Sequence, residues 1–165
     1  MYNCIKKTRD SVFDGVVYDD LLFVCTLIVK TGRRLALLDS DVVEAVTMKG
    51  IKEELDLAQV THCLPPYRII EEFIEKYKLQ KGQYYDYEFG YEGYNYPDDD
   101  YLGHMYARLI VDAWYYSKES IMSVFEQVFL KSTFPYCVHH FKTMTYVTPP
   151  QQILYEFLTG YYDKN

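Results

Sequence analysis

The sequence predicts an α+β fold: a single helix-rich domain, residues 1–165, with a small antiparallel sheet. Two observations support this prediction. After Asp39 apolar residues recur mostly at helical spacing, whereas the chain before Asp39 is rich in the β-branched residues that favour strands. The length is close to the commonest domain size, and no repeat or linker divides the chain.

The segment before Asp39 is predicted to form a β-hairpin. "VCTLIV" has strand composition, and "KTGR" is typical of a tight turn, so residues 22–30 would pair with residues 34–38. "FDGVVY" is a candidate for a third strand. A buried helix through residues 18–31, ended by Gly32, is the alternative, because short apolar runs do not separate strand from helix.

Helical signals begin at Asp39. Asp41 and Glu44 have the spacing of a capping box, and Gly50 stands where such a helix would stop. The next segment, "IKEELDLAQ", is compatible with a further short turn of helix, and "CLPPYR" predicts extended backbone because prolines disfavour helix in the residue before them.

Four further segments carry apolar stripes at helical spacing: residues 67–79, 101–116, 118–130 and 148–161. In the first, Glu72 and Lys76 lie one turn apart and are predicted to pair. Ser117 is predicted to cap the third, and Thr148 with Gln151 forms a capping box for the fourth. Between the last two helices, residues 138–147 alternate and predict a strand.

Catalytic and metal-binding motifs are not recognisable in the sequence. No GxSxG elbow, Walker loop, GxGxxG or HExxH is present. Cys137 and His139 share a face of the predicted strand, too far apart to bond directly, and the His and Cys spacing fits no standard zinc site. His104, Arg108 and Asp112 are predicted to follow the solvent face of a helix, with Arg108 and Asp112 forming an exposed pair. We therefore expect no cofactor and no metal.

Charge and composition restrict the function classes further. The formal net charge of −7 disfavours direct binding to nucleic acid, which requires a basic face. The longest apolar run, residues 21–29, is too short to span a membrane, and the amino terminus lacks the apolar centre of a signal peptide. The four scattered cysteines are typical of reduced thiols in a cytoplasmic protein.

The stretch most indicative of function is "QYYDYEFGYEGYNYPDDDY", residues 83–101, which combines seven tyrosines and six carboxylates with no Lys or Arg. Tyrosines among carboxylates are typical of a surface that binds a basic protein. The structural alternative is that the tyrosines pack on the helices, and that Asp99 or Asp100 caps the helix that follows. The predicted partner-binding residues are Tyr91, Glu92, Tyr94, Tyr96, Asp98, Asp99 and Asp100.

The function predicted from these features is that of a small acidic protein-binding module rather than an enzyme. It would inhibit or neutralise a partner with a basic surface, either a basic enzyme or toxin, as an immunity protein or antitoxin does, or a nucleic-acid-binding protein, as phage anti-defence proteins do. One alternative is a metal-dependent hydrolase or nuclease-like enzyme using Asp98, Asp99, Asp100 and His104 around a divalent cation. Another is a structural subunit that self-associates, for example as a homodimer.

Overall fold

The computed structural model describes residues 2–85 and 96–165, and over these ranges it is dominated by helices. In these two ranges, seven α-helices and two short 3-10 helices accompany one two-stranded antiparallel sheet. Of the residues, 66% are helical and 4% are in strands. This confirms the predicted class of a helix-rich α+β domain with a small antiparallel sheet.

The sheet is a short hairpin just before the first helix. Strands β1 (Val12–Phe13) and β2 (Val16–Val17) pair with Val12 opposite Val17. The turn between them holds Asp14 at φ 51° and Gly15 at φ 77°. A two-residue hairpin turn needs positive φ at both positions, which Asp-Gly accommodates well. "FDGVVY" is therefore not the third strand that the sequence predicts, but most of a hairpin of its own, with the turn in its middle.

Helix α1 (Tyr18–Leu35) occupies the region in which the sequence predicts a longer hairpin. The predicted pairing of residues 22–30 with residues 34–38 is wrong, and the alternative of a buried helix is the correct one. The apolar run is buried around most of its circumference, because α1 packs against both α2 and α4. This burial overrides the strand preference of its β-branched residues. The helix ends at Ala36, in the left-handed region, rather than at Gly32.

Helix α2 (Asp39–Thr61) runs through the glycine at which a stop was predicted. It is kinked at Thr47, whose backbone is not helical, and it continues beyond Gly50. A Cβ at Gly50 would lie 2.8 Å from the Tyr77 ring, so this glycine permits close packing rather than ending the helix. The predicted capping box of Asp41 and Glu44 is not formed, since Leu38 is the N-cap and no side chain caps the helix.

Helices α3 (Pro66–Tyr77) and α4 (Asp99–Tyr116) lie where their apolar stripes predict them. The predicted ion pair between Glu72 and Lys76 is replaced by two others. Glu72 pairs with Arg68 on the surface, and Lys76 reaches Glu54 of α2, 2.7 Å away. Lys76 thereby ties α3 to α2.

The last third of the chain contains helices α5 (Ile121–Leu130), α6 (Phe134–His139) and α7 (Pro150–Leu158), with 3-10 turns η2 (Phe141–Thr143) and η3 (Thr145–Val147). Ser120, not Ser117, caps α5, and Pro149 occupies the N-cap of α7 in place of the predicted capping box. The strand predicted over residues 138–147 is wrong. The Thr143 hydroxyl donates to the carbonyls of Cys137 and His140, and these local bonds replace strand pairing.

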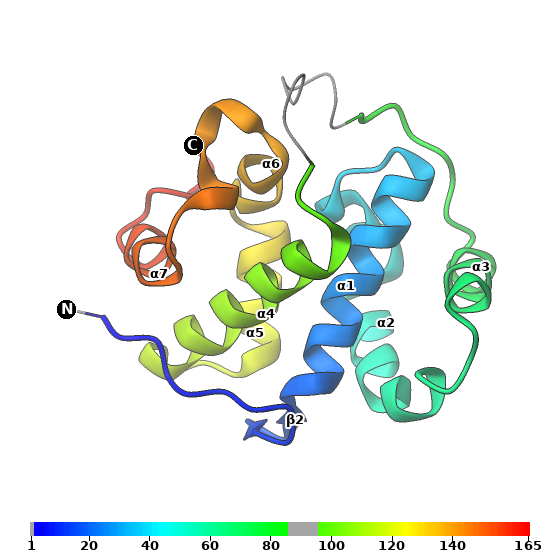
Figure 1. The fold of residues 1–165 in the computed structure, drawn as a ribbon, viewed down its shortest axis with the longest axis horizontal. Coiled ribbons are helices and arrows are strands. Elements are labelled where there is room, and N and C mark those ends of the chain that lie inside the picture. The colour runs from blue at the N-terminus through cyan, green and yellow to red at the C-terminus, as the bar shows by residue number, and fades with distance from the viewer. Residues whose placement is uncertain (1, 86–95) are drawn as a thin grey trace.

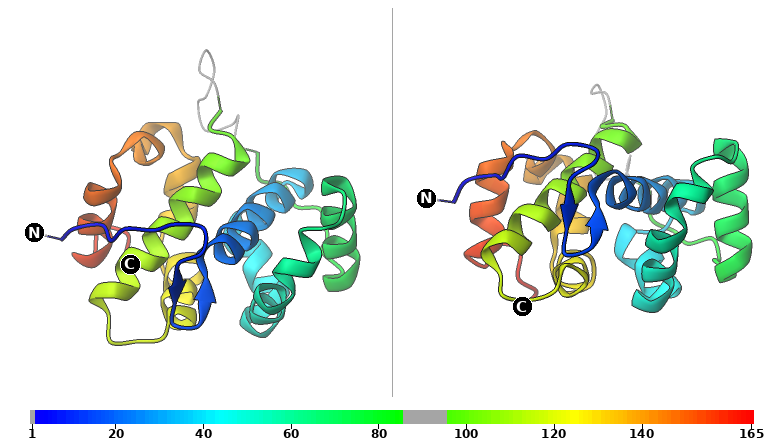
Figure 2. Two further views of the ribbon diagram at one scale, coloured as in Figure 1. Left: turned by 60° about the horizontal axis from the view of Figure 1, so that its bottom comes forward. Right: turned by 90° about the horizontal axis from the view of Figure 1, so that it is seen from below.

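Helices α1 and α4 lie side by side at the centre of the molecule (Figure 1). Helices α2 and α5 pack against each other and against this pair, α3 forms one edge of the molecule, and α6 and α7 lie towards the opposite edge (Figures 1 and 2). The buried apolar residues of these helices form one core cluster. None of the helices in the two described ranges combines the length and apolar character needed to cross a membrane.

An extended amino-terminal segment runs along α4 and is held by Asp112. The Asp112 carboxylate accepts from the Ile5 amide at 2.9 Å and pairs with the Lys7 ammonium at 2.6 Å. Asp112 is 1% exposed, so the predicted exposed pair with Arg108 is wrong. The partners of Asp112 lie more than a hundred residues away in sequence, where helical spacing gives no information about them.

Candidate functional site

The run Asp98–Asp100 lies at the start of α4, and each carboxylate has a different environment. Asp98 is the N-cap, and its side chain accepts from the Tyr101 amide at 2.6 Å. The cap is therefore Asp98 rather than the Asp99 or Asp100 predicted from the sequence. Asp99 and Asp100 occupy the first turn, where carboxylates interact favourably with the positive end of the helix dipole.

Two cations from α1 approach this acidic turn. Arg33 Nη1 lies 2.8 Å from Asp99 Oδ1, and both side chains are partly shielded. Lys30 Nζ lies 3.9 Å from Asp100 Oδ1, at the limit of an ion pair, and the Asp100 side chain is 77% exposed. Asp99 is thus engaged within the fold, whereas Asp100 remains available to a partner.

Exposed apolar side chains surround the same turn. Tyr96 and Tyr101 flank the three carboxylates, and the Tyr101 hydroxyl donates to the Tyr146 carbonyl at 2.6 Å, which brings η3 beside the start of α4. Met144 and Val147, on either side of Tyr146, are also exposed. We call this region the α4-end surface; it consists of Tyr96, Asp98, Asp100, Tyr101, Met144 and Val147.

Three of the predicted partner-binding residues, Tyr91, Glu92 and Tyr94, lie outside the described residues. The other four, Tyr96 and Asp98–Asp100, lie together at the start of α4. The sequence did not indicate that Tyr101, Met144 and Val147 would join them. No sequence signal pairs Tyr101 with η3, because the contact depends on how α4 crosses the segment between α6 and α7.

A buried polar network lies below this surface. His139 Nε2 is 2.6 Å from Asp39 Oδ2, and the Tyr106 hydroxyl donates to the same oxygen at 2.5 Å. Asp39 begins α2, Tyr106 is on α4 and His139 ends α6, so a single carboxylate joins three helices. Asp39 and His139 are 1% and 2% exposed. Burial, together with the Asp39 charge, raises the pKa of Tyr106 well above its ordinary value, so the phenol remains a donor.

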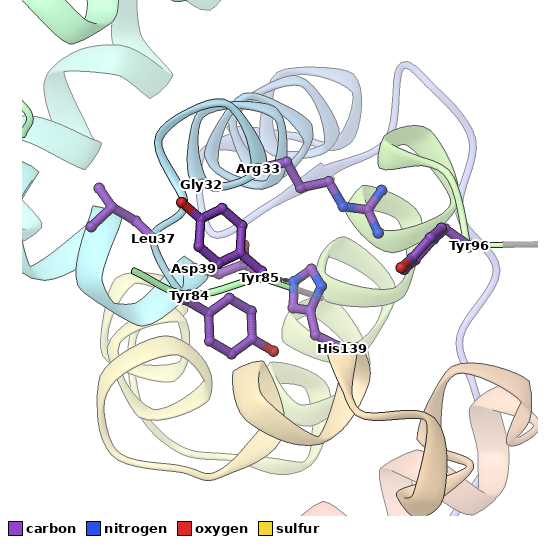
Figure 3. A pocket seen from close by; sticks show the side chains of 8 residues that line it. All are labelled: Gly32, Arg33, Leu37, Asp39, Tyr84, Tyr85, Tyr96 and His139. Carbon is purple, nitrogen blue, oxygen red and sulfur yellow. Dashed lines mark hydrogen bonds and ion pairs between the residues drawn. The ribbon is translucent and has the colours of Figure 1, made fainter. Parts of the chain in front are cut away.

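The network borders a pocket of about 360 Å³, shown in Figure 3. Arg33 enters it from α1, Tyr84 and Tyr85 from the segment after α3, and Tyr96 from the segment before α4. Gly32 allows the Leu37 carbonyl and the Asp39 carboxylate to approach α1 closely, since a Cβ there would lie 2.8 Å from the former and 3.2 Å from the latter. The described lining residues include no Cys, Ser or Thr, the usual nucleophiles of covalent catalysis.

Cys25, which is fully buried in α1, lies close enough to the network for the Asp39 charge to act on it. Burial and the Asp39 charge raise its pKa well above the ordinary value, which keeps it a thiol and unreactive. Over residues 2–85 and 96–165 the structure gathers no three His, Cys, Asp or Glu side chains that could hold a metal ion. His104 is exposed on α4.

The Asp39–Tyr106–His139 network could not be predicted from the sequence. Asp39 marks a helix start, Tyr106 belongs to an apolar stripe, and His139 was assigned to a strand that is in fact α6. The one usable signal is an Asp in front of an apolar helix, which predicts a helix end but not its partners. Comparison of the chain with protein-family models, with curated proteins and with solved structures gives no match.

Proposed function

We propose that this protein acts by binding another protein that has a basic surface, and that it inhibits or neutralises that partner. The observation that supports this proposal best is the α4-end surface, where exposed Tyr96, Tyr101, Met144 and Val147 adjoin the carboxylates of Asp98 and Asp100. Apolar anchors within a charged rim are typical of protein interfaces.

The three carboxylates at the start of α4 have different roles in this surface. The Asp100 carboxylate is 77% exposed and, among the described residues, makes only a long contact to Lys30, so it can pair with a partner's Lys or Arg. Asp99 is held by Arg33 and Asp98 caps α4, so both position the surface. The net charge of −7 steers a basic partner towards the protein over longer distances and raises the association rate.

The proposal also places the protein in the cytoplasm. Cys4, Cys25, Cys63 and Cys137 are all free thiols, which suits a reducing compartment. A partner in the same compartment would be an enzyme or toxin with a basic face, or a nucleic-acid-binding protein whose phosphate groove accepts an acidic surface.

The test is affinity capture from a lysate of the source organism, with wild type beside Asp100→Lys and Val147→Glu. Both positions are exposed and outside the core, so these variants are expected to fold. Glu44→Lys on α2 is the matched control, because it makes the same charge change at an exposed site away from α4. Circular dichroism and melting temperature confirm the fold of each bait.

The proposal expects one basic protein to be retained by wild type and by Glu44→Lys, and to be lost with Asp100→Lys and with Val147→Glu. Retention should weaken between low and moderate salt, because steering by exposed charges is screened. Equal recovery with all four baits would place the interface elsewhere. An apparent mass that rises with concentration, in the absence of any captured protein, would favour self-association instead.

A further inference from the structure

A second pocket lies between α1 and α3, on the side of the molecule away from α7. It has a volume of about 340 Å³, within the range of small-molecule sites. Its walls are mainly apolar, with Leu27 from α1, Leu64 from the turn after α2, and Ile69 and Ile70 from α3. All of its lining residues belong to the described part of the chain.

The packing of α3 leaves this space open. Only Ile69 and Phe73 of α3 are buried. A smaller cavity of about 160 Å³ lies on the other flank of Ile69 and shares Leu27 and Leu64 with the first pocket. Helix α3 is thus supported along a narrow line at the edge of the molecule (Figure 2), and a ligand can enter beside it without displacing the α1–α4 core.

The two ends of the pocket differ chemically. Phe23 and Lys30 lie seven residues apart on α1, which corresponds to about 10 Å of helix. At one end the Phe23 ring meets the His62 ring edge-on, with centroids 4.2 Å apart. At the other end stands the Lys30 ammonium, whose only described contact is the 3.9 Å approach to Asp100. The pocket is therefore apolar and aromatic at one end and cationic at the other.

The charges around the pocket identify the cationic end. The Asp20 carboxylate lies close enough to His62 to interact with it electrostatically, so that end of the pocket already has a negative charge beside it. Lys30 has the exposed Asp100 side chain, and such a solvated pair contributes little and is easily exchanged for a ligand carboxylate. A carboxylate bound by Lys30 inside the mouth of an apolar pocket would be better shielded from water than Asp100 is.

We propose that the pocket between α1 and α3 binds a small amphipathic carboxylic acid, with its carboxylate on Lys30 and its apolar chain directed towards Phe23 and His62. An unbranched acid of about eight carbons matches the length of α1 that the pocket follows. This site is separate from the α4-end surface, although Asp100 touches both through Lys30.

The probe is octanoate, titrated calorimetrically into the full chain below its micelle-forming concentration. Wild type should bind one octanoate saturably, and octanol about tenfold more weakly, because a charge-assisted hydrogen bond is lost. Lys30→Met should lower octanoate affinity about tenfold for the same reason. Asp100→Asn should raise it a few-fold by freeing Lys30.

Two controls make the result specific. Lys49→Met removes an exposed lysine of α2 that does not line the pocket, and it should leave affinity unchanged. Ile70→Trp fills the pocket from the half-buried face of α3 and should abolish binding, with melting temperature reporting that the variant folds. In wild type, octanoate should shift the methyl resonances of Ile69 and Ile70 but not that of Ile153 on α7.

The absence of saturable binding to wild type would overturn the proposal. Octanol binding as tightly as octanoate, or equal losses in Lys30→Met and Lys49→Met, would overturn the assignment of the carboxylate to Lys30. Methyl shifts at Ile153 without shifts at Ile69 and Ile70 would place the ligand elsewhere. None of these results depends on whether the α4-end surface binds a protein.

Discussion

The carboxylates buried in the core and those at the start of α4 have opposite environments and opposite roles. Asp39 and Asp112 are each 1% exposed, and each accepts hydrogen bonds from groups distant in sequence. The Asp100 side chain is 77% exposed, and its contact with Lys30 is long. The most exposed contact of the conspicuous acidic run, that of Asp100, thus contributes little to the fold, whereas two isolated buried carboxylates join segments distant in sequence.

The largest effect should come from Asp39→Ala. This change leaves His139 and the Tyr106 hydroxyl buried without their shared acceptor, and the loss of one member of a buried charged network costs about 3–5 kcal/mol. Chemical denaturation measures the change in the free energy of unfolding. Asp41→Ala, at the exposed position two residues later, should cost less than about 1 kcal/mol. Similar losses in the two variants would remove the distinction between buried and exposed carboxylates.

Asp112→Ala should have the next largest effect, about 2–3 kcal/mol, because the Ile5 amide and the Lys7 ammonium lose their acceptor. The extended amino-terminal segment can then detach from α4. Hydrogen exchange at the Ile5 amide should accelerate far more than exchange within α4 itself. Unchanged protection of Ile5 would show that other contacts hold this segment.

Alkaline pH provides a graded test of the network through Tyr106. Burial raises the pKa of Tyr106 in the folded protein, whereas the unfolded chain ionises near 10.0, so above this pH the folded state binds more protons. The free energy of unfolding therefore falls with rising pH, by about 1.4 kcal/mol per pH unit for each such tyrosine. Tyr18, whose pKa burial raises to about 12, contributes in the same window. Tyr106→Phe removes one such tyrosine, so the free energy of unfolding should fall less steeply with pH, by up to about 1.4 kcal/mol per pH unit.

Denaturant titrations of wild type and Tyr106→Phe at about pH 9, 10 and 11 measure these slopes. The stability that the raised pKa of Tyr106 provides is complete below the unfolded value and is lost above it, so the two slopes should differ only on the alkaline side. Parallel curves over the whole range would show that Tyr106 ionises equally in both states.

The smallest effects separate the residues of the acidic run itself. Asp98→Ala removes the N-cap of α4 and should cost about 1 kcal/mol. Asp100→Ala should cost less than about 0.5 kcal/mol, because it removes only an exposed, long ion pair. Melting temperatures of the two variants, measured side by side, rank them. A larger loss for Asp100→Ala would make that residue structural and weaken its assignment to a binding surface.

Short sequence patterns predicted the elements that depend mainly on residues close in sequence. The stripes of α3, α4 and α5 and the acidic start of α4 could all be identified from short windows of sequence. Helix α1 was misassigned because its β-branched run is buried by α2 and α4, which a window of residues does not reveal. The strand prediction over residues 138–147 is wrong because the Thr143 hydroxyl bonds to the local backbone there.

The candidate site could likewise be predicted where it depends on neighbours in sequence, but not where it depends on packing. Tyr96 and the three aspartates are neighbours in sequence, so their clustering could be predicted, although Asp98 rather than Asp99 or Asp100 is the cap. The contributions of Arg33, Met144 and Val147 come from α1 and from the segment around η3. Only the packing of α4 against both brings them to the same end of the molecule.

The most direct test of the central claim is site-specific photocrosslinking at the α4-end surface. A benzophenone amino acid replaces Val147, and in a matched protein it replaces Val60 at the far end of α2, which is even more exposed, at 72% against 52%. On illumination in a lysate of the source organism, the account predicts one crosslinked basic protein from position 147 and none from position 60. The crosslink should disappear when Asp100→Lys is added. Crosslinking of that protein from position 60 and not from position 147 would contradict the account.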